Sequence, residues 1–183
     1  QEQDAHTFDT FFMAMRRPLP GGAKSQISET RLVCLDRRTG QLRWADSLGD
    51  VPDTGSLRSL SMSSCPLVVG QKVYVVARGR KSGQFEDCYV LCFNRADGKY
   101  RWACYIASAN ATNFGFTEPS NDRENSISHL ASAGGRVYVQ SNVGAVAAID
   151  AYSGCVDWLD IYPRRQQSAG DFSPMRGIGS SLA

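Results

Sequence analysis

The sequence predicts an all-β fold built from repeated units of four antiparallel strands. Two observations support this prediction: one hairpin motif occurs three times without a gap, and a strand–turn–strand segment precedes two of its copies. A repeat of helical hairpins would show apolar residues with a 3.6-residue period, and these segments do not. We therefore expect the repeats to form sheets.

The hairpin motif has a fixed order of residue types. An apolar run leads to Asp or Asn; three residues later comes Thr, Asp or Ser, then glycine, and tryptophan follows four residues after the glycine. All three tryptophans of the chain occupy this position. The three copies contribute Asp36, Thr39, Gly40 and Trp44, then Asn94, Asp97, Gly98 and Trp102, and finally Asp150, Ser153, Gly154 and Trp158.

The chemistry of this motif predicts a β-hairpin. The apolar runs, such as Val90–Phe93, suit a strand that is buried on both faces. The Asp or Asn side chain can accept hydrogen bonds from backbone amides ahead of it, and glycine adopts a positive φ without steric cost. Loops of three to five residues with such a glycine commonly join two antiparallel strands.

A second recurring segment completes the unit. Leu67–Val76 and Ala131–Val139 each read as strand, tight turn and strand, with Tyr74 and Tyr138 in register. The motif glycines recur at intervals of 58 and 56 residues, which accommodates four strands of ordinary length with their loops. We therefore expect a partial β-propeller of four-stranded antiparallel blades, with two complete blades and flanking partial ones.

The pattern small-x-Asp-x-x-Thr-Gly-x-x-x-Trp resembles the repeat of pyrroloquinoline-quinone-like β-propellers, the quinoprotein dehydrogenase-like superfamily. The resemblance covers about residues 30–162. The first copy departs from the pattern at Cys34 and the third at Ser153, whereas the second departs at Asn94 and Asp97. The resemblance implies that each tryptophan lies flat against the glycine turn of the next blade and locks the two blades together. The motif residues are thereby expected to be structural.

The blade boundaries predict an organisation in six parts. They are an N-terminal segment that is a linker or the start of the first blade (1–29), a partial blade ending in the first tryptophan hairpin (30–62), a blade (63–108), a long inter-blade loop (109–126), another blade (127–163), and a linker with the start of the next blade (164–183). Propellers close with about 4–8 blades. We therefore expect a fragment of a larger propeller, or a half that another chain completes.

Composition limits the classes of partner. A formal net charge of +2 is too small to indicate nucleic acid, and no apolar stretch approaches the ~20 residues of a membrane span. The six cysteines contain no C-x-x-C pair, which argues against a structural zinc site. Cys34 and Cys92 share one position in the motif and are expected as small buried residues, and pairing of the other four is left open.

Departures from the repeat are the places where a binding function is expected. Arg78–Asp87 lengthens the middle connection of the second blade and is expected as a solvated hairpin extension. Ser108–Asn125 is the longest irregular stretch, and loops of this length are often functional. Its amide and carboxylate oxygens beside aromatic rings make it a candidate binding loop, with candidate residues Asn110, Asn113, Phe114, Phe116, Glu118 and Asp122.

The function that these observations favour is a non-enzymatic scaffold, with a protein partner or the remaining propeller blades as its partners. We expect no catalytic residue, no metal site and no cofactor, because the sequence lacks G-x-S-x-G, H-E-x-x-H and a phosphate-binding glycine loop. One alternative, implied by the resemblance, is part of a quinoprotein dehydrogenase that binds pyrroloquinoline quinone and calcium. Another is a docking platform in outer-membrane assembly or sensing. The resemblance also implies a periplasmic or exported location.

Overall fold

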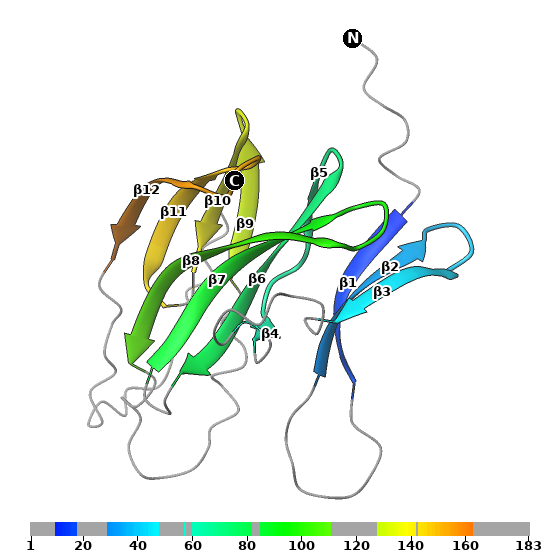
Figure 1. Cartoon of the computed structure of the whole chain (residues 1–183), viewed down its shortest axis with the longest axis horizontal. Helices are drawn as coiled ribbons and strands as arrows, with labels where there is room; N and C mark the ends of the chain where they lie inside the picture. Colours follow the sequence, from blue (N-terminus) through cyan, green and yellow to red (C-terminus); the bar gives the residue numbers. More distant parts are fainter. Residues whose placement is uncertain are drawn as a thin grey trace, which may run out of the picture.

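The computed structural model describes residues 10–17, 29–47, 57, 60–81, 85–110, 128–141 and 143–162. This part of the chain forms twelve strands in three antiparallel sheets, which lie side by side like adjacent blades (Figure 1). We call them blade A (β1–β3), blade B (β4–β8) and blade C (β9–β12). The expected fold class, a partial β-propeller, is confirmed. The described residues include no helix of the length and apolarity that crossing a membrane would need.

Blade C is a complete four-stranded unit. Its strands follow one another across the sheet in chain order, which is the up-and-down arrangement expected from the sequence. Tyr138, Ala148 and Trp158 lie opposite one another on the three outer strands. The strands are β9 (His129–Ala133), β10 (Arg136–Gln140), β11 (Ala145–Asp150) and β12 (Val156–Ile161).

Blade B has the same strand order, but two short strands together take the place of its innermost strand. Two short strands, β4 and β5, pair with different parts of β6. Tyr74 lies opposite Cys92, which lies opposite Trp102, in the register that blade C repeats. The strands are β4 (Ser61–Met62), β5 (Leu67–Val69), β6 (Lys72–Lys81), β7 (Phe85–Asn94) and β8 (Tyr100–Asn110).

Blade A contains three described strands: β1 (Thr10–Arg17), β2 (Glu29–Asp36) and β3 (Leu42–Ser47). The N-terminal segment therefore supplies a strand of the first blade. Phe12 of β1 lies opposite Cys34, as Tyr74 does opposite Cys92, so β1 takes the place that β6 has in blade B.

The hydrophobic core lies between the blades. Leu32 and Cys34 of blade A pack in one buried cluster with Val73, Val75 and Leu91 of blade B. A second cluster joins buried residues of β7 and β8 to those of β10 and β11. Burying an aliphatic side chain stabilises a fold by about 1.5–3 kcal/mol, so each blade depends on its neighbour for much of its stability.

Buried cysteines form part of this core. Cys34 and Cys92 are buried, as expected for small apolar residues, and all six cysteines are free thiols. Burial raises the pKa of both Cys88 and Cys92 to about 12, which keeps these thiols protonated and unreactive.

The strands of blade B are longer than the sequence indicated. β7 begins at Phe85 and pairs with β8 as far as Asn110, so residues 109 and 110, expected in the long loop, belong to β8. The cause is the lengthened β6–β7 hairpin, which gives β8 a partner strand for its last residues. We call this region, residues 78–81 and 85–89 with 105–110, the blade B extension.

Candidate functional site

The turn of the first hairpin is built around the carboxylate of Asp36. One of its oxygens, Oδ1, accepts hydrogen bonds from the amides of Arg38 (3.0 Å) and Thr39 (2.9 Å) and from the Thr39 hydroxyl (3.0 Å). Gly40 has a φ of 69° and donates its amide to the Asp36 carbonyl at 2.8 Å. The motif thus folds into a turn through contacts between residues near in sequence.

The third copy repeats this geometry. Oδ1 of Asp150 accepts hydrogen bonds from the Ser153 amide and hydroxyl, both at 2.7 Å, and from the Tyr152 amide at 3.1 Å. In the second copy two side chains, rather than one, accept the hydrogen bonds of the turn. Asn94 accepts from the Ala96 amide, and Asp97 accepts from the Lys99 amide. Both departures from the family pattern are therefore compatible with the same turn.

These contacts lower the pKa of the two turn carboxyls. For Asp36 the largest cause is the guanidinium of Arg43, at 2.8 Å, followed by the hydrogen bonds from Thr39. For Asp150 the largest cause is the amide of Ser153, followed by its hydroxyl. Hydrogen bonds to the ionised form favour that form.

A pH prediction follows for the turns. Because the pKa of each carboxyl is lower in the folded chain than the ~3.9 of an unfolded one, their contribution to stability is complete above pH ~4. It is lost as the pH falls through the lower folded values. As the pH is lowered below 4, we expect the urea concentration at the unfolding midpoint to fall. It should fall less in the double variant Asp36→Asn, Asp150→Asn. Asp160→Asn, on β12 outside the turns, is the control. An equal fall in the double variant would contradict the prediction.

The joint between blades A and B is formed by Trp44. Its indole Nε1 donates to the carbonyl of Arg95 at 3.0 Å, across 51 residues of sequence. Its ring lies against the second turn so closely that a methyl group on Gly98 would be 2.6 Å from Cε3. Phe12 packs against the ring with 5.7 Å between centroids.

The joint between blades B and C repeats this contact and adds two donors. Trp102 donates Nε1 to the carbonyl of Tyr152 at 3.2 Å, and its ring covers Gly154, where a methyl group would be 2.6 Å from Cδ2. Tyr74 donates its hydroxyl to the carbonyl of Ala151 at 2.7 Å.

The ammonium group of Lys72 completes this joint. Nζ donates to the carbonyls of Ala151 (2.8 Å) and Tyr152 (3.1 Å), and it lies 4.5 Å from the centre of the Tyr152 ring. Sequence reasoning missed Lys72, and it noted Tyr74 only for its register with Tyr138. That register was the available signal, because it repeats a tyrosine in the two blades where the structure pairs it with Trp102 and Trp158.

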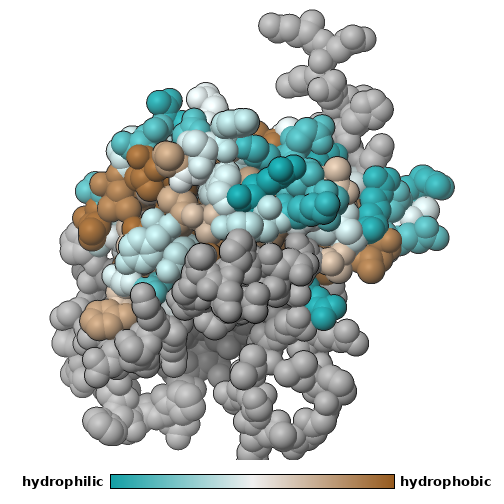
Figure 2. All heavy atoms as spheres, viewed as in Figure 1, coloured by the Kyte–Doolittle hydropathy of each residue, from teal (hydrophilic) through white to brown (hydrophobic). Residues whose placement is uncertain are grey.

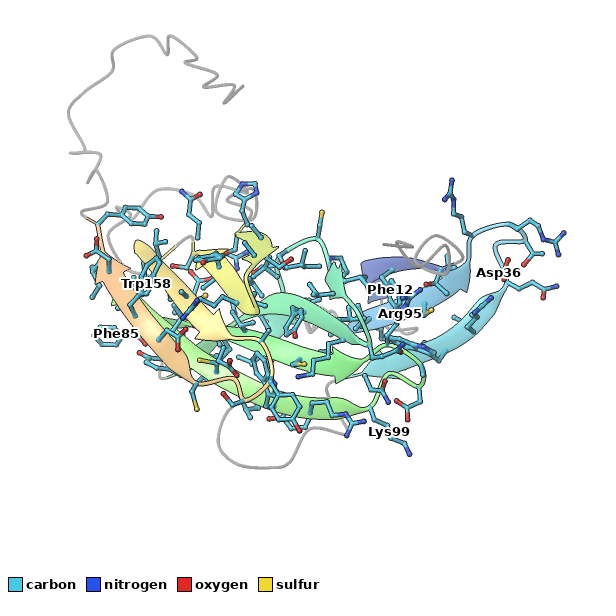
Figure 3. The ribbon with its side chains drawn as sticks, turned by 90° about the horizontal axis from the view of Figure 1, so that it is seen from above. Phe12, Asp36, Phe85, Arg95, Lys99 and Trp158 are labelled. Atoms are coloured by element: carbon cyan, nitrogen blue, oxygen red, sulfur yellow. The ribbon has the colours of Figure 1, made fainter. Side chains whose placement is uncertain are left out.

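Among the described residues, no further blade lies against the third tryptophan. Trp158 packs with Tyr138 at 6.3 Å between centroids, but it is 46% exposed. Apolar atoms gather over β12 at the left edge of the molecule in Figure 2, and Figure 3 labels Trp158 at one end of the row of blades. The exposed apolar residues of this edge are Val156, Trp158, Leu159, Ile161 and Tyr162.

Residues 27–173 match the family model described as "Outer membrane protein assembly factor BamB". The chain belongs to this family. The expected resemblance to pyrroloquinoline-quinone-like propeller repeats is confirmed. No curated protein matches the sequence at a significant level.

The solved structures that are similar to this chain have low sequence identity with it. A quinohemoprotein alcohol dehydrogenase from Pseudomonas putida HK5 is 18% identical over 72% of this chain and 24% of its own, with a TM-score of 0.47. A europium-containing methanol dehydrogenase is 14% identical over 82% and 30%, with a TM-score of 0.49. BamB from Moraxella catarrhalis is 16% identical over 72% and 44%, with a TM-score of 0.28. The chain spans less than half the length of each.

The blade B extension holds polar contacts at positions outside the motif that recurs in the three blades. Arg78 pairs with Glu86 at 3.1 Å. The buried carboxylate of Asp87 accepts a hydrogen bond from Ser108, whose oxygen accepts one from the hydroxyl of Tyr105 at 2.9 Å. The predicted solvated extension is thus an ordered surface on three strands.

Two aromatic side chains stand out on this extension. Phe85 is 46% exposed and Tyr105 is 50% exposed, and Tyr105 is held edge-on against Tyr89 at 5.4 Å. Among the candidate loop residues, Asn110 belongs to β8, opposite Phe85. The others, Asn113, Phe114, Phe116, Glu118 and Asp122, lie outside the described residues. Within the described residues no three His, Cys, Asp or Glu side chains are grouped to hold a metal ion.

Proposed function

We propose that the chain is part of a non-enzymatic β-propeller scaffold that docks another protein through the blade B extension. The observation that carries this proposal is the pair of exposed aromatic residues, Phe85 and Tyr105, on an ordered surface that the repeat does not need. Tyrosine and phenylalanine are enriched at protein interfaces, where their large rings bury much area at little entropic cost. The motif tryptophans Trp44 and Trp102 are engaged in joints, and the turn carboxylates in turns.

The polar network supports the same use of the surface. Tyr105 is fixed by its hydrogen bond to Ser108 and by its contact with Tyr89, so binding would cost it little rotamer freedom. The Arg78–Glu86 ion pair lies on the other face of the same strands, so it does not border the two exposed rings. A docking platform in outer-membrane protein assembly, in a periplasmic or exported location, agrees with the description of the family model.

Quinone binding separates this proposal from the alternative, part of a quinoprotein dehydrogenase. The chain is titrated with pyrroloquinoline quinone in the presence of calcium and followed by absorbance and calorimetry. We expect no saturable binding. A saturable, calcium-dependent change would overturn the scaffold and favour the dehydrogenase.

Site-specific crosslinking tests the docking surface itself. A photo-crosslinking amino acid replaces Phe85 in cells that express the chain, and adducts are identified by mass spectrometry. We expect one defined protein adduct that Tyr105→Ala reduces at least fivefold. Tyr152, which is 83% exposed at the joint end of blade C, is the control position and should not form that adduct. The same adduct from both positions would contradict a specific surface.

A further inference from the structure

Two cysteines lie on different sides of the joint between blades B and C. Cys104 belongs to β8, and Cys155 belongs to the turn between β11 and β12. The two blades lie side by side, and β8 contacts β11 (Figure 1). Neither cysteine is one of the residues that define the recurring motif, so the turns and joints described above do not account for them.

Cys104 lies on the face of β8 that packs against blade C. It follows Trp102 by two residues in a part of the strand without a bulge, so both side chains point to the same face of the sheet. Cys104 is 7% exposed and belongs to the buried cluster that contains Val139 and Ala147 of blade C. Its thiol is therefore part of the joint.

Cys155 lies next to the glycine that Trp102 covers. A methyl group on Gly154 would be 2.6 Å from Cδ2 of Trp102, and Cys155 is the next residue of the turn. Its carbonyl accepts a hydrogen bond from the Asp150 amide at 2.8 Å, and its amide donates to the Ser153 hydroxyl at 3.3 Å. These bonds fix the backbone, whereas the exposed side chain can change rotamer without displacing packed atoms.

The two sulfur groups are close enough to interact electrostatically. Burial raises the pKa of the Cys104 thiol, and the negative charge of a Cys155 thiolate raises it further. A like charge shifts a pKa in this way only when it is nearby. This agrees with the geometry, because one cysteine follows the tryptophan on its strand and the other follows the glycine under the tryptophan ring.

The corresponding positions at the A–B joint also hold a complementary pair of residue types. Asp46 stands two residues after the tryptophan of blade A, and Lys99 stands directly after the turn glycine of blade B. One joint thus has opposite charges at these two positions, and the other joint has two thiols. Opposite charges attract each other, and two thiols can be joined covalently.

We propose that Cys104 and Cys155 form a disulfide bond that links blades B and C covalently in an oxidising environment. The oxidant is a low-molecular-weight disulfide. The Cys155 thiolate attacks one sulfur of that disulfide, which breaks its S–S bond, forms a mixed disulfide and releases one thiol. The Cys104 thiolate then attacks the Cys155 sulfur and displaces the second thiol, which takes up the proton that Cys104 lost. The two cysteines give up two electrons, and the small disulfide gains them.

The position of the two groups favours this reaction despite burial. The thiolate is the nucleophile, so the raised pKa of Cys104 slows the second attack. That attack takes place within one folded unit, however, which gives it a high effective concentration. Disulfides persist in oxidising compartments, which suits the proposed periplasmic or exported location. The bond is separate from the blade B extension and does not depend on the proposed docking function.

The test is oxidation of the folded, reduced chain in a glutathione redox buffer with air excluded. Mass spectrometry of peptides under non-reducing conditions identifies the linked cysteines. We expect the peptide that carries Cys104 to be joined to the one that carries Cys155, in the monomer, and to be released by a reductant. Cys155→Ser should abolish the link, whereas Cys65→Ser, at the other exposed cysteine, should leave it intact. Circular dichroism establishes that each variant is folded.

Stability provides a second measurement. Oxidation should lower the equilibrium constant for unfolding of the wild-type chain on the order of 100-fold, because the bond restricts the unfolded chain. It should leave the constant of Cys155→Ser unchanged. Glutathione that stays on Cys155 without a link to Cys104, or a link from Cys155 to a second chain, would overturn the proposal. A wild-type chain that is equally stable before and after oxidation would also contradict it.

Discussion

Replacing Trp102 by alanine should lower the free energy of unfolding by ~3–5 kcal/mol, the range for buried large-to-small changes. The ring packs with Tyr74, covers Gly154 and donates to the carbonyl of Tyr152, so its loss opens a cavity between blades B and C and leaves Lys72 as the remaining donor to that carbonyl among the described residues. The measurement is equilibrium urea unfolding, followed by fluorescence and circular dichroism at a concentration where the chain is monomeric.

Two variants separate the parts of this effect. Trp158→Ala removes the same residue where no described blade covers it, and we expect a cost below ~1 kcal/mol in the monomer. Trp102→Phe retains much of the ring but loses the N–H donor, which should cost about 1–2 kcal/mol. If Trp102→Ala and Trp158→Ala were equally mild, Trp102 would not hold the blades together.

The local parts of the fold were predictable from the sequence. Each hairpin is specified by residues within nine positions of one another, such as Asp36, Gly40 and Trp44, so its turn and register follow from nearby chemistry. The alignment of Tyr74 with Tyr138 similarly predicted the first two strands of blades B and C. Repetition strengthened both predictions, because a pattern that occurs more than once is rarely accidental.

The parts that depend on distant residues were not predictable. β1 pairs with β2 across a separation that no motif marks, and the inner position of blade B is divided between β4 and β5. The length of β8 depends on the β6–β7 hairpin beside it. At the joints, the contact from Lys72 to the Ala151 carbonyl spans 79 residues and exists only because the blades pack together.

The second large loss of stability is expected from substitutions of the turn glycines. Gly154→Ala should destabilise the chain by about 2–5 kcal/mol, because two costs add. The φ of 77° costs an L-residue about 1–2 kcal/mol. The new methyl group would lie 2.6 Å from Cδ2 of Trp102, and such overpacking typically costs ~1–3 kcal/mol more.

Gly40→Ala is the matched control, because Gly40 has a similar φ of 69° and open space where the methyl group would lie. It should therefore carry the strain alone, about 1–2 kcal/mol. Gly98→Ala, under Trp44, should behave like Gly154→Ala. Urea unfolding of the three variants at dilute concentration measures the difference. Equal losses at all three glycines would mean that the tryptophans yield to the added methyl groups, and that backbone strain alone accounts for the glycine in each turn.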